Sequence, residues 1–362
     1  MLQMKRELLA GLEDGLEPHA QALGVHRARQ GPHEALRGLR KALQVAIELE
    51  HSTIPPYLYA LYSLMPGANA EIAGLISSVV AEEMAHMALA CNVLNAIGGK
   101  PAIDRPAFIP KYPGPLPGTV EDQLTVDLAP FSIVLLRDVF MVIEQPEEPL
   151  HFALAAGTAG PLTIGGFYER VKGAIKHAGE AVFKGRDPAR QVYGGIALPE
   201  VIAVENVASA CEAIDAIVEQ GEGTSHSPLG DRAGDELAHY YRFEEIVEGR
   251  KLIPAPKHKP PWAYQGEVIP FDAAKVYPSL TNPRSERYPA GSAARYACDT
   301  FNYTYTSLLK VLHETFNGHP GRLEAAVGLM ESLNEQARGM MAMDSGIGGN
   351  AGPSFEYRPT NP

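Results

Sequence analysis

The sequence predicts a mainly α-helical protein built on a four-helix bundle, with a long proline-rich connection and extra helices at its C-terminal end. Apolar residues recur at three- and four-residue intervals, which is the helical period, whereas the two-residue alternation of strands is scarce. Two Glu-x-x-His motifs, Glu83 with His86 and Glu236 with His239, lie about 150 residues apart in such stretches. These observations favour a helical bundle that carries polar ligands inside it.

The helical segments can be placed in order. The first is expected over residues 34–62, where Pro55 and Pro56 should kink or break it. The second is expected over residues 70–97 and ends at a Gly-Gly pair, after which residues 100–128 form the proline-rich connection. Further helices are expected over residues 131–145, 162–177, 199–220, 231–248, 292–316 and 321–343.

Composition divides the chain into three parts. Residues 1–33 are expected to form a polar N-terminal arm and residues 34–250 the helical bundle. Residues 251–362 are expected to form an irregular wrap, rich in Pro, Lys and Tyr, followed by C-terminal helices that pack on the bundle.

Charge and cysteine content exclude several classes of function. The chain has 362 residues and a formal net charge of −12, so nucleic acid and anionic membranes are poor partners. The odd number of cysteines, three, argues against a disulfide framework, and their spacing argues against a zinc or iron–sulfur site. The N-terminal residues lack the apolar core of a secretory signal, and no apolar run of membrane-spanning length is expected. A cytoplasmic location is therefore expected.

Helical spacing explains why the two Glu-x-x-His motifs indicate a metal. Residues three apart on a helix share a face, so each motif offers one carboxylate and one imidazole to the same point. Two such pairs, each matched with a lone glutamate from another helix, are what a carboxylate-bridged dinuclear iron or manganese site in a four-helix bundle requires.

Periodicity selects the inward-facing acids of the first two helices. Glu83 and His86 continue the apolar stripe of the second helix, whereas Glu82 falls beside it. A charge on a buried stripe is costly, and a cation would remove that cost; the alternative is a surface Glu–His pair. In the first helix Glu50 lies on an apolar row and Glu48 on a polar one. Glu50 and Glu83 are nearly equidistant from the intervening turn, so an antiparallel pair places them at the same height.

The remaining ligands come from later helices. Glu144 ends an apolar helix and is preferred to Glu169, which shares a row with two lysines. His239 is the firmer ligand of the second motif, and Glu236 shares its stripe. Glu222, in a Gly-Glu-Gly turn, is a candidate to replace or supplement Glu236. For Glu144 and Glu222 the alternative is an exposed acid.

Two tyrosines are the candidate catalytic side chains. Tyr57 and Tyr168 lie on or near these helices and would act as redox-active or substrate-lining groups. The alternative for both is ordinary core packing, because most tyrosines at helical spacing only pack.

Carboxylates and imidazoles suit two iron ions, or manganese, better than copper or a thiolate zinc site. Haem held by His86 or His239 is disfavoured by the acidic surroundings. A dinuclear iron site binds dioxygen, and the outcome is iron oxidation or oxidation of an organic substrate. The long connection and the C-terminal extension exceed what iron storage needs, which favours a covered substrate pocket.

The chain resembles a ferritin-like family that includes the iminophenyl-pyruvate dimer synthase domain of bacterial bis-indole pigment pathways. The resemblance lies in the segments IELEHSTIPPYLY (47–59), VAEEMAHM (80–87) and CNVLNAIGG (91–99), with support from TIGGFY (163–168), EQGEGT (219–224), HYYRF (239–243) and AGPSFEY (351–357). It implies a ferritin-like four-helix bundle with Glu50, Glu83, His86 and His239 at metal positions. It also implies oxidative coupling of an imine derived from an aromatic amino acid.

The sequence and the resemblance together predict a non-haem dinuclear-metal enzyme, preferably di-iron. It would be an O2-dependent oxidase or oxygenase of secondary metabolism that acts on a small, amino-acid-derived, imine-like substrate. The alternatives are a ferroxidase-type iron-binding protein and a metal-binding bundle without catalysis. A homo-oligomer is left open.

Overall fold

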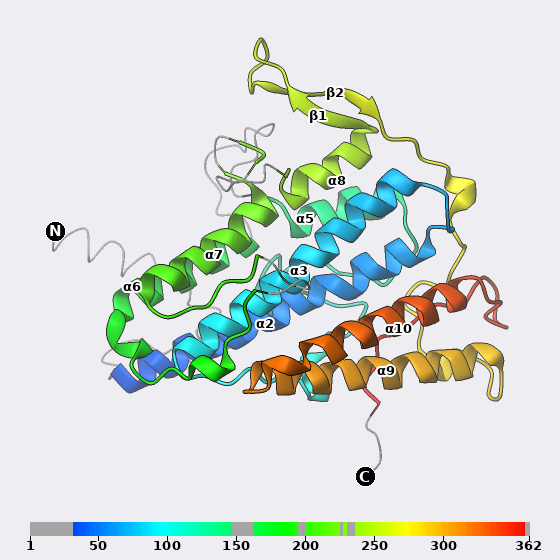
Figure 1. The fold of residues 1–362 in the computed structure, drawn as a ribbon. Coiled ribbons are helices and arrows are strands. Elements are labelled where there is room, and N and C mark those ends of the chain that lie inside the picture. The colour runs from blue at the N-terminus through cyan, green and yellow to red at the C-terminus, as the bar shows by residue number, and fades with distance from the viewer. Residues whose placement is uncertain are drawn as a thin grey trace.

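The computed structural model describes residues 32–146, 162–194, 198, 200–224, 227–229 and 236–358. Two long antiparallel helices, α2 (Pro32–Ser63) and α3 (Ala70–Ala96), lie side by side at its centre (Figure 1). The Arg40 guanidinium near the start of α2 donates to the carbonyl oxygen of Ile97 just after α3, with Nε 2.9 Å away, which ties the far ends of the pair together. The expected N-terminal arm lies almost wholly outside the described residues.

The remaining elements cover the two flanks of this pair. Helices α6, α7 and α8 pack on one flank, and α9 and α10 pack together against α2 and α3 on another (Figure 1). Their bounds are α4 (Ile133–Leu135), a π-helical turn (Leu136–Phe140), α5 (Met141–Ile143), α6 (Ile164–Ala178), α7 (Val207–Glu222), α8 (His239–Glu248), α9 (Ala293–Phe316) and α10 (Leu323–Met341). The mainly α-helical class expected from the sequence is confirmed.

Residues 251–290 are more regular than expected. They include most of an antiparallel hairpin, β1 (Arg250–Pro254) and β2 (Trp262–Val268), which projects from the body directly after α8 (Figure 1). The chain then returns along the end of α2, where the amide of Tyr277 donates to the carbonyl oxygen of Ser63 at 2.7 Å. Strands this short carry too few alternations to stand out in a sequence rich in proline and lysine.

Helix α2 passes through Pro55 and Pro56 without a break, so the expected interruption was wrong. A proline in a helix leaves the carbonyl four residues earlier without its amide donor. For Pro56 that carbonyl belongs to Ser52, and the Tyr112 hydroxyl donates to it at 2.7 Å. The proline-rich connection thus supplies the hydrogen bond that the proline removed.

Two later helices begin further along the chain than expected. Helix α7 begins at Val207 because Asn206 caps it, its side chain accepting from the amide of Ser209. Helix α8 begins at His239, and Ala238 before it has extended backbone angles. Residues 236–238 are not helical. The second Glu-x-x-His motif therefore does not lie on one helix, contrary to the prediction.

Helix α3 is an exception to the expectation that the chain has no apolar run long enough to span a membrane. By length and composition alone it could cross a membrane, with a mean hydropathy of 1.3 over its most apolar window. Just over half of that window, 56%, is buried, and the helix carries Glu83 and His86 among its buried residues. A core helix passes the same test, and α3 lies at the centre of the bundle.

His51 on α2 gives a prediction about pH. Its ring packs on Phe108, and its Nε2 lies 2.7 Å from the Tyr305 hydroxyl. Burial lowers the pKa of His51 to about 3. An unfolded chain binds this proton near pH 6.5, so the native state loses about 1.4 kcal/mol per pH unit as the pH falls from there toward 3.

We expect the advantage of the wild type over His51→Gln, measured by urea unfolding, to shrink between pH 7 and pH 5. Glutamine does not titrate but can still bond to the tyrosine hydroxyl. The exposed His177 provides a control, His177→Gln, whose stability difference from the wild type should vary little over this range. A pH-independent difference for His51→Gln would contradict the prediction.

Candidate metal centre

Five of the side chains selected from the sequence converge inside the bundle. Glu50 comes from α2, Glu83 and His86 from α3, Glu144 from the residue that follows α5, and His239 from the first position of α8. None is more than 4% exposed. Such burial of three carboxylates requires compensation by positive charge or hydrogen bonds.

The two imidazoles turn the same nitrogen toward the carboxylates. Nδ1 of His239 lies 2.9 Å from Oε1 of Glu83 and 3.4 Å from Oε2 of Glu144. Nδ1 of His86 lies 3.6 Å from Oε2 of Glu50 and 3.8 Å from the same Oε1 of Glu83. The rings are stacked with centroids 5.3 Å apart. Glu83 thus faces both imidazoles with one oxygen.

Hydroxyl groups hold the other oxygen of each carboxylate. Tyr168 donates to Oε1 of Glu50 and Tyr57 to Oε1 of Glu144, both at 2.5 Å. Thr53 donates to Oε2 of Glu83 at 2.8 Å. The tyrosines singled out from the sequence therefore touch the two outer carboxylates. Each carboxylate is oriented by one hydroxyl and keeps its second oxygen facing an imidazole.

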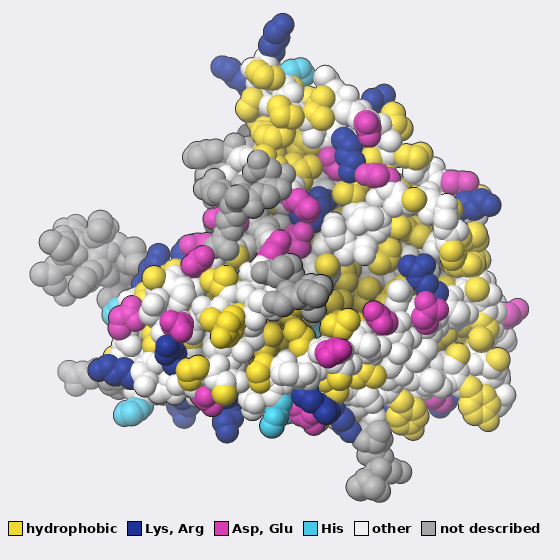
Figure 2. Space-filling model, in the orientation of Figure 1, with side chains coloured by type: hydrophobic (Ala, Val, Ile, Leu, Met, Phe, Trp, Pro, Cys, Tyr) yellow, Lys and Arg dark blue, Asp and Glu magenta, His cyan; other side chains and the backbone are white. Residues whose placement is uncertain are grey.

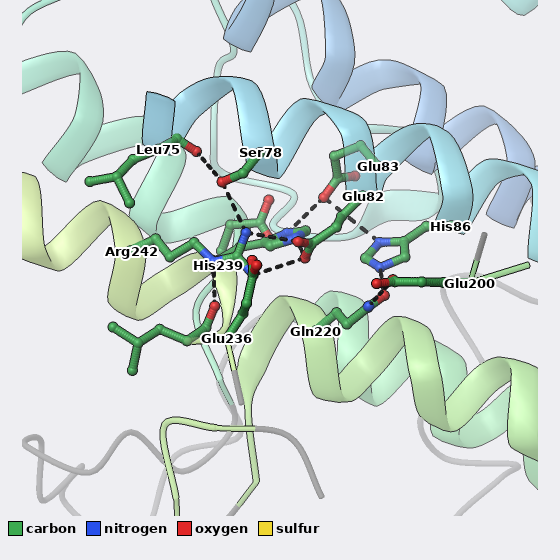
Figure 3. A network of polar contacts seen from close by, with 12 residues as sticks. Leu75, Ser78, Glu82, Glu83, His86, Glu200, Gln220, Glu236, His239 and Arg242 are labelled. Atoms are coloured by element: carbon green, nitrogen blue, oxygen red, sulfur yellow. Dashed lines mark hydrogen bonds and ion pairs between the residues drawn. The ribbon is translucent and has the colours of Figure 1, made fainter. Parts of the chain in front are cut away.

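The outer nitrogens of the imidazoles determine which tautomer is present (Figure 3). Nε2 of His239 lies 3.0 Å from a carboxylate oxygen of Glu82, and Nε2 of His86 lies 2.9 Å from Oε1 of Gln220. The Gln220 amide nitrogen donates to Glu200 at 2.6 Å, which leaves its oxygen toward His86. Both Nε2 atoms therefore donate, which leaves both Nδ1 atoms facing carboxylate oxygens: a protonated Nδ1 donates to them, and a neutral one is free to bind a cation.

This arrangement fits a metal ion. Nδ1 of His239 is buried and lies 2.9 Å from Oε1 of Glu83, so on a neutral ring no described donor satisfies it. The Nδ1 lone pair of a neutral ring would be repelled by these carboxylates, and either a proton or a metal cation between them removes the repulsion. Two ligand atoms bound side by side to one cation at about 2.1 Å are about 3 Å apart. Nitrogen and oxygen ligands of this kind suit iron or manganese.

Without a cation, burial and neighbouring charges shift the pKa values of Glu83 and His239. Burial, followed by the charge of Glu144, raises the pKa of Glu83 to about 7. Burial alone would lower the pKa of His239, but hydrogen bonds with Glu144, Glu82 and Glu83 outweigh burial and raise it. A cation that binds here must displace protons, so its uptake releases protons to solvent.

The ion pair of Glu82 with Arg242 holds the His239 ring in position through its Nε2 atom (Figure 3). Arg242 donates to both carboxylate oxygens of Glu82, at 2.8 and 3.1 Å, and its Nη1 also donates to the Ser78 hydroxyl at 3.1 Å. Burial alone would raise the pKa of Glu82, but hydrogen bonds from His239 and Arg242 lower it to about 2. Glu82 is therefore an anion held in place beside the ring of His239.

The structure places the other candidate acids elsewhere. The Glu236 side chain is 70% exposed and lies 3.1 Å from Arg242, so its selection as an inward ligand is corrected. It precedes α8, and its side chain is therefore not set by the helical stripe of His239. Glu222 is buried, and its Oε1 accepts from the amide of Gly165 at 2.6 Å. Glu169 is 54% exposed and pairs with Lys172, in agreement with the preference for Glu144.

Sequence reasoning missed the outer partners of the imidazoles. Glu82 was set aside because it falls beside the buried stripe, and Gln220 carries no charge that would attract attention. Glu82 precedes a ligand directly, and an acid in that position is a usable signal, because ligand imidazoles commonly donate their second nitrogen to a carboxylate. For Gln220 the sequence offers no comparable signal.

The contact between Glu222 and Gly165 gives a second prediction. A Cβ atom added at Gly165 would lie 2.5 Å from both carboxylate oxygens of Glu222. We expect Gly165→Ala to displace that carboxylate and destabilise the protein by about 1–3 kcal/mol, since a buried acceptor loses its donor. Gly173→Ala is the matched control on the same helix, because a Cβ there meets nothing within 4 Å. Thermal unfolding should show stabilisation by about 1 kcal/mol for this control. Equal effects of the two substitutions would contradict the prediction.

An apolar cavity of about 350 Å³ lies between α2, α3 and the C-terminal helices α9 and α10. Figure 2 shows hydrophobic side chains in the hollow between α3 and α10. Its lining includes Met84, Met87 and Met330, with His51 and Arg338 among the polar residues. Among the described residues that line it, none is one of the five that converge.

Comparisons with known proteins show which family the chain belongs to. A ferritin-like family profile matches residues 43–248. The chain is 26% identical, over 91% of its length, to dichlorochromopyrrolate synthase of Lentzea aerocolonigenes, and the alignment covers 37% of that longer protein. The chain thus spans little more than a third of this relative.

The fold is also similar to a crystal structure of a ferritin-like protein from Caulobacter vibrioides, with a TM-score of 0.61, 23% identity, and coverage of 88% of this chain and 97% of that one. The family profile matches more than half of the chain and contains all five converging residues. The chain belongs to the ferritin-like family.

Proposed function

We propose that this protein is a non-haem dinuclear-metal oxidase or oxygenase, with two iron ions held by Glu50, Glu83, Glu144, His86 and His239. The observation that carries the proposal is the pair of Nδ1 atoms facing three carboxylate oxygens in a buried centre. Two iron ions would supply electrons to dioxygen at this point. The cation-binding donor set also admits manganese.

The chain's own residues would bind the cations, orient the carboxylate ligands and exclude water from the centre. Glu83, whose Oε1 faces both imidazoles, would help to hold both cations, one together with Glu50 and His86 and the other together with Glu144 and His239. Tyr168 and Tyr57 would fix the outer carboxylates through their hydroxyls and place two phenols beside the centre. The near-complete burial of these residues would exclude bulk water.

The substrate class follows from the relative rather than from the geometry. Because dichlorochromopyrrolate synthase aligns with most of this chain, we propose a small amino-acid-derived, imine-like substrate. We therefore propose a role in secondary metabolism, as an enzyme inside the cell.

Metal analysis and oxygen uptake test the proposal. Protein purified without a metal-affinity tag should contain close to two iron ions per chain. The anaerobically reduced protein should consume dioxygen faster when imines of aromatic amino acids are added. Absence of metal after loading with ferrous ion would refute the proposal.

A ferroxidase-type iron-binding protein is the second candidate, and one observation favours it. The apolar cavity described above does not include any of the five proposed ligands in its described lining. Rapid oxidation of ferrous ion that no organic compound accelerates would support this candidate against the first.

A further inference from the structure

We propose that the two cation positions are unequal, and that the half formed by Glu83, Glu144 and His239 takes up the first divalent cation. The other half, formed by Glu50, Glu83 and His86, would fill second and bind more weakly. This inference rests on the proposed function, because it requires these five residues to bind metal.

The first observation is the spacing of the ligand atoms. Nδ1 of His239 lies 2.9 and 3.4 Å from its two carboxylate oxygens, whereas Nδ1 of His86 lies 3.6 and 3.8 Å from its own pair. Neighbouring ligands of one cation are about 3 Å apart. The His239 half is therefore close to binding geometry, and the His86 half must contract, which costs binding free energy.

The second observation is the chemical difference between the outer partners (Figure 3). His239 donates to the carboxylate of Glu82, and His86 donates to the neutral amide oxygen of Gln220. A hydrogen bond to a carboxylate is stronger than one to an amide and makes the imidazole a more basic ligand. The His239 ring is therefore the better donor to a cation.

The third observation is how firmly each partner is held. Arg242 grips Glu82 with two hydrogen bonds and is itself buried, with a further bond to the Leu237 carbonyl oxygen. Gln220 is held by Glu200, which is exposed. The charges of Glu82 and Arg242 nearly cancel at a distance, so the advantage comes from the acceptor strength and fixed position of Glu82.

Titration of the full-length apoprotein with Mn²⁺ tests the order of binding. Calorimetry, with electron paramagnetic resonance of the free ion, should resolve a tight event followed by a weaker one. Glu144→Gln, which alters only the His239 half, should remove the tight event. Glu50→Gln, which alters only the His86 half, should leave the tight event and remove the weaker one. Exposed Glu169 gives the control Glu169→Gln, which should leave both events unchanged.

Exchanging the outer partners tests the cause. Glu82→Gln should weaken the tight event by about 10- to 100-fold, the usual cost of losing an outer partner. The double substitution Gln220→Glu with Glu200→Gln gives His86 a carboxylate partner that still receives a hydrogen bond. It should tighten the weaker event by a similar factor. The double substitution leaves the ion pair of Glu82 with Arg242 intact, so it remains informative if Glu82→Gln fails to fold.

The outcomes separate this inference from the proposed function. If Glu50→Gln removes the tight event, or if the outer-partner substitutions change both events equally, the inference is overturned while metal binding stands. If the wild type binds no Mn²⁺ and no ferrous ion, the proposed function and the inference fall together.

Discussion

Replacing Glu83 by glutamine is expected to abolish stable binding of both metal ions. Its Oε1 is the oxygen that faces both imidazole Nδ1 atoms, at 2.9 and 3.8 Å. An amide of the same shape lacks the charge that offsets two cations, so each half loses a ligand at once. The loss should exceed the 10- to 100-fold typical of an outer partner. Elemental analysis after gel filtration should fall from about two ions per chain to fewer than one.

Glu71 provides the matched control for this substitution. It lies on the same helix, is 48% exposed and pairs with Lys251. Glu71→Gln should retain the full metal content. If Glu83→Gln also retained two ions, the metal centre would have to lie elsewhere in the chain.

Removing Arg242 is expected to give a large loss of stability. The Arg242 side chain is 5% exposed and that of Glu82 is 15% exposed, so Arg242→Met leaves a carboxylate largely buried without its cation. Breaking such a pair from one side costs about 3–5 kcal/mol. Urea unfolding of the metal-free protein should show this decrease in the free energy of unfolding.

A double substitution distinguishes the cost of leaving the Glu82 carboxylate unpaired from the cost of lost side-chain packing. Glu82→Met combined with Arg242→Met should cost less than the sum of the two single substitutions, because no charge is left unpaired. The exposed pair of Arg137 and Asp138 is the control, and Arg137→Met should leave the free energy of unfolding nearly unchanged, because exposed ion pairs contribute little. Additive losses at Glu82 and Arg242 would show that the ion pair does not couple them.

The sequence by itself determined the helical class and most of the converging residues. Apolar periodicity placed α3 within a residue of its observed end and selected Glu83 over Glu82 as the inward acid. Equal distances from the turn matched Glu50 to Glu83, and both lie within 4 Å of the His86 ring nitrogen. These inferences succeeded because a helical stripe is local information: the residues that share a face lie three or four positions apart.

Only the tertiary structure decided which groups complete the centre. Glu236 fits the helical spacing but precedes the start of α8, so its carboxylate lies at the surface. Gln220 and Glu82 contact imidazoles that are 134 and 157 residues away in the sequence. Tyr112 donates to the Ser52 carbonyl oxygen beside the prolines of α2, from 60 residues away. Such pairings depend on how helices pack against one another. The periodicity of one segment carries no information about which side chains a distant segment places beside it.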